Sequence, residues 1–120
     1  MSLTAYQKAQ LTTEDPRSTE YRLFGLVTSA LMEASRAAKG SPKIIEAIDW
    51  NRRLWSTLAA DCADEGNVLP PQVRAQIISL SLWVGRYSSQ VIQENATIDP
   101  LVDINRTIMQ GLAPQAASAG

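Results

Sequence analysis

Proline residues divide this chain into helical segments. Asp15-Pro16, Ser41-Pro42 and Asp99-Pro100 each place a helix-capping residue directly before a proline, and Pro70-Pro71 marks a fourth start. A capping side chain accepts a hydrogen bond from a free amide of the first turn, and proline at the first helical position loses no bond there. The four signals therefore predict where four helices begin.

Apolar residues recur between these signals at the 3.6-residue spacing of a helix, and no alternating strand pattern is present. The expected helices cover residues 16–39, 42–64, 71–95 and 100–110, after a short, weak helix at 3–12. Gly40 and Gly111 are expected to end the first and the last of the four. Short loops favour antiparallel neighbours. The sequence therefore predicts an all-α bundle of four main helices plus a short N-terminal helix, with one domain over residues 1–112 and a flexible tail at 113–120.

The composition excludes several function classes. The chain has 120 residues, among them no histidine and one cysteine, and its formal net charge is −1. Without histidine the chain lacks the usual general base and the commonest metal ligand, and one cysteine cannot form a disulfide framework. The charge argues against direct nucleic-acid binding. No segment approaches the ~20 apolar residues that span a bilayer, and no signal peptide is visible. We expect a cytoplasmic protein without metal, cofactor or membrane insertion.

The acidic residues form no recognisable catalytic set. Three carboxylates within residues 61–65 lie beside a loop, Asp99 has the position of a helix cap, and Asp103 falls in a first turn, where the helix dipole favours it. Cys62 lies on the apolar side of its helix and is expected to be a small buried side chain. We expect no enzymatic activity.

Residues 50–55 (WNRRLW) combine two tryptophans, two arginines and an amide within two turns. Asn51 falls in the middle of the apolar face of its helix. A buried amide without partners costs about 1–3 kcal/mol. We expect Asn51 to contact Asn105 or a backbone group near the start of the last helix, as a structural polar contact.

The helix at residues 71–95 is apolar on two sides. One interpretation is a central helix of the bundle, and the other is a groove for an amphipathic helix of a partner. A homodimer interface also fits. Tryptophan and arginine are enriched at binding hot spots. The candidate partner contacts combine these residue types with the second apolar side, and are Trp50, Arg52, Arg53, Ile78, Leu82, Trp83 and Arg86.

Six short strings occur together in a fixed order along the chain. They lie at residues 5–7 (AYQ), 17–24 (RSTEYRLF), 50–55 (WNRRLW), 75–84 (AQIISLSLWV), 86–88 (RYS) and 103–112 (DINRTIMQGL). In this order they resemble the flagellar biosynthesis regulator FlaF of alphaproteobacteria, over about residues 2–112.

The resemblance implies a cytoplasmic, non-enzymatic factor of flagellum biogenesis. It implies that the chain binds flagellin as a chaperone-like factor and couples flagellin synthesis to secretion. An alternative is a post-transcriptional regulator that acts through the repressor FlbT or the flagellin mRNA. A structural subunit of the export apparatus is a third, which requires membrane association that the sequence does not support. Which flagellin segment binds, and the oligomeric state, stay open at this point.

Overall fold

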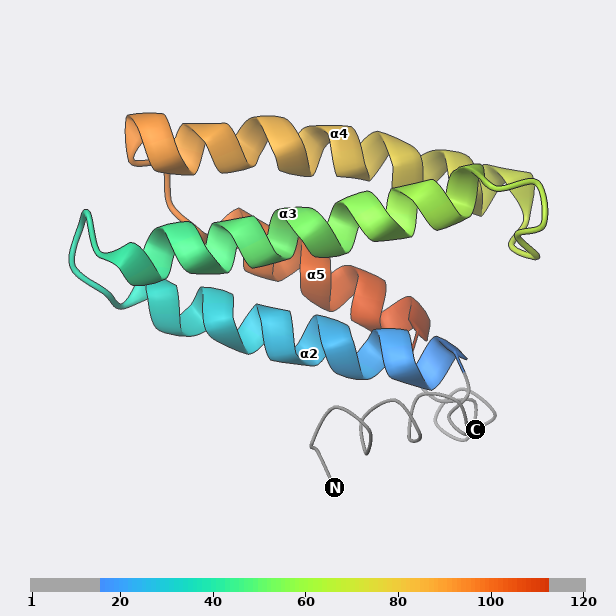
Figure 1. Ribbon diagram of the computed structural model, residues 1–120, viewed down its shortest axis with the longest axis horizontal. Helices are drawn as coiled ribbons and strands as arrows, with labels where there is room; N and C mark the ends of the chain where they lie inside the picture. Colours follow the sequence, from blue (N-terminus) through green and yellow to red (C-terminus); the bar gives the residue numbers. More distant parts are fainter. Residues whose placement is uncertain (1–15, 113–120) are drawn as a thin grey trace, which may run out of the picture.

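The computed structural model describes residues 16–112, which form four α-helices joined by short loops (Figure 1). The helices are α2 (Pro16–Ser35), α3 (Pro42–Ala63), α4 (Pro71–Glu94) and α5 (Asp99–Leu112). No strand occurs among these described residues, and the expected all-α bundle is confirmed. The helix expected at 3–12 and the tail expected at 113–120 lie outside the described residues.

The helix starts agree with the proline pattern, with one difference. Ser41 caps α3, because its Oγ accepts a 3.2 Å hydrogen bond from the Lys43 amide. At α4 the Pro70 carbonyl accepts the first helical bond, from Arg74. The expectation that Asp99 caps α5 is wrong. The carbonyl of Ile98 accepts from Leu101 and Val102, so Asp99 lies inside the first turn.

Two expected helix ends are also wrong. Helix α2 ends at Ser35 rather than at residue 39, since Arg36 and Ala37 bond to carbonyls three residues back and Ser35 Oγ donates to the Met32 carbonyl at 2.6 Å. Gly40 adopts a left-handed φ of 82° in the loop that follows. Helix α5 continues through Gly111 to Leu112. Glycine tolerates both conformations, so its presence alone does not fix a helix end.

Helix α3 is the central helix of the bundle. It packs closely against α2 and α4, while α5 packs against α2. Figure 1 shows α3 between α4 and α2. The interpretation of residues 71–95 as the central helix is therefore wrong. Helix α4 buries one side, through Ile77, Val84, Ser88 and Val91, and leaves large apolar residues of its second side exposed.

The core forms around an aromatic pair. Phe24 of α2 and Trp55 of α3 meet edge to face, with ring centroids 5.7 Å apart and an interplanar angle of 88°. Such a pair adds about 0.5–1.5 kcal/mol beyond the apolar area it buries. Leu26, another apolar residue of α2, is 55% exposed. Two residues advance about 200° round a helix, which places Leu26 almost opposite Phe24.

Candidate functional site

A buried polar network joins three helices. Asn105 Nδ2 of α5 donates to Asn51 Oδ1 of α3 at 2.8 Å and to Thr28 Oγ1 of α2 at 3.2 Å. Asn105 Oδ1 accepts from Trp55 Nε1 at 2.8 Å. Both asparagines are fully buried. The hydrogen bond expected between the two amides is present, and it lies in the interior rather than on a surface that a partner reaches.

Sequence reasoning missed two buried polar residues. Thr28 is buried in the network, and Ser88 is fully buried on the packed side of α4. Each continues an apolar stripe at spacings of four and three: Thr28 lies between Phe24 and Leu31, and Ser88 between Val84 and Val91. Their position within an apolar stripe could have predicted that they are buried, because a hydroxyl in the centre of a stripe is buried together with its apolar neighbours.

The second side of α4 carries a row of apolar and small residues that includes the candidate contacts Ile78 and Leu82. Ile78, Leu82, Gly85, Ser89 and Ile92 follow one another at spacings of four, three, four and three, the pattern of a coiled-coil seam. Leu82 is 62% exposed and Ile92 38%. We call this surface, together with Ile45 and Arg52 of α3, the α3/α4 face.

Helix α3 borders this face with one arginine and one isoleucine. Ile45 is 56% exposed and precedes Arg52 by seven residues, about two turns, so both point to the same side of α3. Arg52 contacts Ser89, three residues before Ile92. In this antiparallel pair Ile45 therefore lies beside the end of α4 that carries Ile92. The α3/α4 face therefore has exposed apolar residues on both helices, Ile45 on α3 and Leu82 and Ile92 on α4.

Arg52 is half-buried at the centre of the face. Its Nη2 donates to the Gly85 carbonyl at 3.0 Å and to Ser89 Oγ at 2.5 Å. Arg52 forms no ion pair with any residue in the described range 16–112. A guanidinium carries five N–H donors, so Nε and Nη1 keep donors that these two bonds do not use. The face thus combines an apolar rim with a cation that lacks a counter-charge within residues 16–112.

Gly85 forms part of a shallow hollow at this point. The hollow is lined by Arg52, Trp55, Ser56, Ser81, Val84 and Gly85. A Cβ placed on Gly85 would meet nothing within 4 Å apart from its own stretch of helix backbone. Glycine in a helix interior is less stable than alanine by about 0.5–1 kcal/mol. No neighbour within the described bundle therefore requires glycine at this position.

The other candidate contacts point in different directions. Trp50 is 40% exposed and lines a hollow between α2 and α3 with Ala30 and Ala34. Arg53 faces solvent and pairs with Asp49 at 3.0 Å within its own helix. The structure therefore separates Trp50 from the α3/α4 face, while Arg52, Ile78 and Leu82 share that face.

Trp83 and Arg86 lie beyond the α3/α4 face on α4. Trp83 is half-buried and stacks on Tyr87, with centroids 5.1 Å apart. The Tyr87 hydroxyl donates to the Thr97 carbonyl at 2.6 Å, which ties the stack to the loop before α5. Trp83 follows Leu82 by about 100° round the helix. Arg86 is exposed between these two directions.

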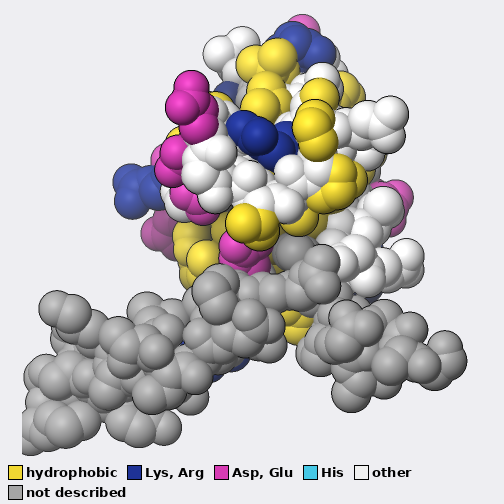
Figure 2. All heavy atoms as spheres, turned by 90° about the vertical axis from the view of Figure 1, so that its right-hand side faces the viewer, with side chains coloured by type: hydrophobic (Ala, Val, Ile, Leu, Met, Phe, Trp, Pro, Cys, Tyr) yellow, Lys and Arg dark blue, Asp and Glu magenta, His cyan; other side chains and the backbone are white. Residues whose placement is uncertain are grey.

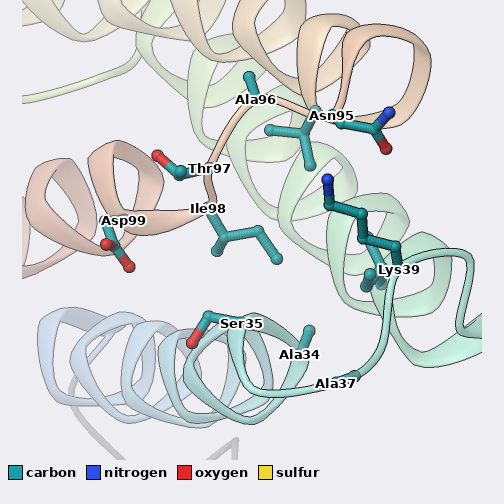
Figure 3. Close-up of a pocket in the computed structure, with 11 residues that line it drawn as sticks. Ala34, Ser35, Ala37, Lys39, Asn95, Ala96, Thr97, Ile98 and Asp99 are labelled. Carbon is teal, nitrogen blue, oxygen red and sulfur yellow. The ribbon is translucent and has the colours of Figure 1, made fainter.

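A second hollow lies at the end of the bundle where the α2–α3 and α4–α5 loops meet. Figure 3 shows Lys39 and Asp99 on opposite sides of it, with Ala34, Ser35 and Thr97 among the lining residues. The Ser35 hydroxyl already donates to the Met32 carbonyl. This hollow presents no paired nucleophile and base. Within residues 16–112 no three His, Cys, Asp or Glu side chains gather to hold a metal ion.

Charge on the molecule is mixed rather than of one sign. On the end of the bundle that Figure 2 shows, acidic and basic side chains are interspersed with hydrophobic ones. Helix α4 has only three charged residues in 24, of which Arg74 is held by the Cys62 and Asp64 carbonyls. The α3/α4 face is therefore suited to an apolar ligand, with Arg52 as its local charge.

Cys62 is a free cysteine and is buried, as expected. Burial raises the pKa of its thiol above the ordinary value of 9.0, and the carboxylates of Glu20 and Asp61 raise it further, against a smaller opposite effect of Arg74. A raised pKa keeps the thiol neutral, and the neutral thiol is a poor nucleophile.

Comparison with known proteins identifies the family. No curated protein and no solved structure matches the chain. None of the helices described here is long and apolar enough to cross a membrane. The model of one family, described as flagellar protein FlaF, matches residues 2–112. Because the match covers nearly the whole chain, the protein belongs to the FlaF family of flagellar proteins.

Proposed function

We propose that this protein binds flagellin through the α3/α4 face and thereby couples flagellin synthesis to secretion, as a non-enzymatic cytoplasmic factor. Membership of a flagellar family supports the pathway. The exposure of Leu82 on a coiled-coil-like row carries the choice of surface. A single exposed leucine is ordinary, but several exposed apolar residues on one face, here Ile45, Leu82 and Ile92, are a feature of interaction sites.

The proposed ligand suits the surface. Before assembly, the terminal helices of flagellin expose an amphipathic face that would otherwise polymerise. A row of apolar residues at spacings of four and three accepts such a helix through its own i, i+3, i+4 and i+7 residues. Binding of this kind is non-covalent and stoichiometric, and it uses no cofactor.

The test is a calorimetric titration of monomeric flagellin into the full-length protein. Leu82→Glu is expected to weaken binding by about tenfold or more, because burying a leucine contributes about 1.5–3 kcal/mol. Gln90→Glu is the matched control. It places the same side chain on an exposed position of α4, about 80° away from Leu82. Wild-type protein that does not bind flagellin would refute the proposal.

Trp50, Arg53, Trp83 and Arg86 are tested separately because they face other directions. A folded Trp50→Ala and Arg53→Glu double variant probes the α2 side of α3, and Trp83→Ala with Arg86→Glu probes the far side of α4. If flagellin occupies the α3/α4 face, both double variants bind more tightly than Leu82→Glu. If either double variant binds flagellin more weakly than Leu82→Glu does, the flagellin site lies on the side of the bundle that this double variant probes.

Regulation through FlbT or the flagellin mRNA is distinguished by parallel titrations with those two molecules. Binding to FlbT without binding to flagellin would favour the regulator, and would contradict the flagellin proposal.

A further inference from the structure

We infer that the flagellin segment received by the α3/α4 face is an amphipathic helix whose apolar stripe contains a carboxylate that pairs with Arg52 above Gly85. This inference rests on the proposed function and specifies the chemistry of its ligand. It follows from the unused donors of Arg52, the open space at Gly85 and the spacing of the apolar row.

The spacing determines the shape of the ligand. Ile78, Gly85 and Ile92 are each seven residues apart, and so are Leu82 and Ser89. This is the pattern of the a and d positions of a coiled coil, over about 21 Å of helix at 1.5 Å per residue. The other side of α4 packs on α3 in the same way, but this row leaves Leu82 and Ile92 exposed. A helix of about two heptads matches it.

Gly85 is the position at which we expect the backbones of α4 and of the ligand helix to come closest. It is the middle residue of the row, and apart from its own stretch of helix backbone nothing lies within 4 Å of the position its Cβ would take. Alanine there would favour the helix. Close approach of an external helix explains the glycine, since backbones approach each other most closely where a side chain is missing.

Arg52 determines the charge of the ligand. Its guanidinium is half-buried against Gly85 and Ser89, and it pairs with no carboxylate of residues 16–112. The neighbouring Asp49 is already paired with Arg53. A helix laid over Gly85 covers Arg52, and covering a cation is unfavourable unless an anion accompanies it. Charge complementarity therefore selects an Asp or Glu at the centre of the apolar stripe.

The first experiment places a side chain in the hollow. Gly85→Leu fills the space while raising helix propensity, so we expect a folded protein whose affinity for monomeric flagellin is lower by about tenfold or more. Gln90→Leu puts the same residue on an exposed position about 140° round α4 and is expected to bind like wild type. If wild type binds flagellin and Gly85→Leu binds equally well, the inference fails and the proposed function stands. If wild type does not bind flagellin, both fail.

The second experiment tests the charge pair by exchange. Arg52→Glu is expected to weaken flagellin binding, with circular dichroism confirming that the variant is folded. Each Asp and Glu of the flagellin terminal helices is then replaced by Lys and titrated against both proteins. One replacement is expected to weaken binding to wild type and restore it to Arg52→Glu. If no replacement restores binding, the inferred flagellin carboxylate is refuted, even if Gly85→Leu has blocked flagellin binding in the first experiment.

Discussion

The side-chain nitrogen of Asn105 lies 2.8 Å from the side-chain oxygen of Asn51, and this hydrogen bond connects α5 to α3 in the fully buried interior. It is one of three bonds that Asn105 makes, with Thr28 and Trp55 as the other partners. Asn51 makes one such bond, and its Nδ2 has no partner among the described residues. The two amides are thus equally buried, but the hydrogen-bonding groups of Asn105 are paired and one of those of Asn51 is not.

This difference predicts unequal costs for removing the two amides. Asn105→Leu leaves Trp55 Nε1 and Asn51 Oδ1 buried without a partner, and each unpaired group costs about 1–3 kcal/mol. Asn51→Leu removes one bond and also removes an amide nitrogen that is already unpaired. We expect Asn105→Leu to lower the free energy of unfolding by roughly 2 kcal/mol more than Asn51→Leu. Urea denaturation followed by circular dichroism measures both.

The double variant is the control for this pair. Residues in direct contact are not additive, so Asn51→Leu with Asn105→Leu is expected to lose less than the sum of the single losses. Equal losses for the two single variants would show that Asn105 is not the centre of the network.

Two glycines predict opposite effects of the same substitution. Gly85 is in a helix interior with open space around its Cβ position, so Gly85→Ala is expected to raise the free energy of unfolding by about 0.5–1 kcal/mol. Gly40 has a φ of 82°, which a Cβ disfavours, so Gly40→Ala is expected to lower it by roughly 1–2 kcal/mol. Thermal unfolding of the two variants beside wild type tests both. A destabilised Gly85→Ala would mean that the bundle itself requires the glycine.

The fold was largely predictable because its signals are local. A cap such as Ser41 and an apolar spacing depend on neighbours within a few residues, and the structure contains the helix starts they predict. The end of α2 depends on the competing bond of the Ser35 hydroxyl, which spacing does not reveal. The central position of α3 was missed for a different reason. Periodicity identifies the apolar sides of a helix but not which of them a neighbour covers.

The candidate site was likewise predictable where its residues lie on one helix, and not where it depends on how helices pack. The apolar row that contains Leu82 is visible in the sequence, because all its members lie on one helix. The bond from Arg52 to Gly85 depends on the register of α3 against α4, which the sequence does not determine. Trp50 and Trp83 are both at the edge of an apolar stripe, and only the packing of helices shows that they face different sides.

Cys62 predicts a pH dependence of stability with a definite sign. Its pKa is raised in the folded state by burial and by nearby carboxylates, so the folded protein holds the thiol proton more tightly than the unfolded chain. The resulting contribution to stability is full below the ordinary pKa of 9.0 and is lost as pH rises through the folded-state pKa. We expect the stability advantage of wild type over Cys62→Ala to shrink above pH 9.0. Urea denaturation under reducing conditions at several pH values measures it.

Thiol labelling provides the control for Cys62. In native buffer near neutral pH the thiol is expected to react slowly with an alkylating reagent, and rapidly once urea unfolds the chain, because burial limits access and the thiolate is disfavoured. Rapid labelling of the native protein would contradict the buried position.

Salt dependence distinguishes the proposed helix ligand from a nucleic acid. Apolar burial at Leu82 is not screened by salt, and a charge pair covered by the ligand at Arg52 is screened much less than an exposed one. We expect the flagellin Kd to change by less than about tenfold between low and high salt, which is a difference of about 1.4 kcal/mol. A protein that makes six to ten phosphate contacts instead loses about 10³–10⁵ in affinity over a modest rise in salt. Calorimetric titration of flagellin, and of flagellin mRNA in parallel, measures both slopes. A flagellin affinity that collapses with salt would show that exposed charges, rather than the apolar row, hold the ligand.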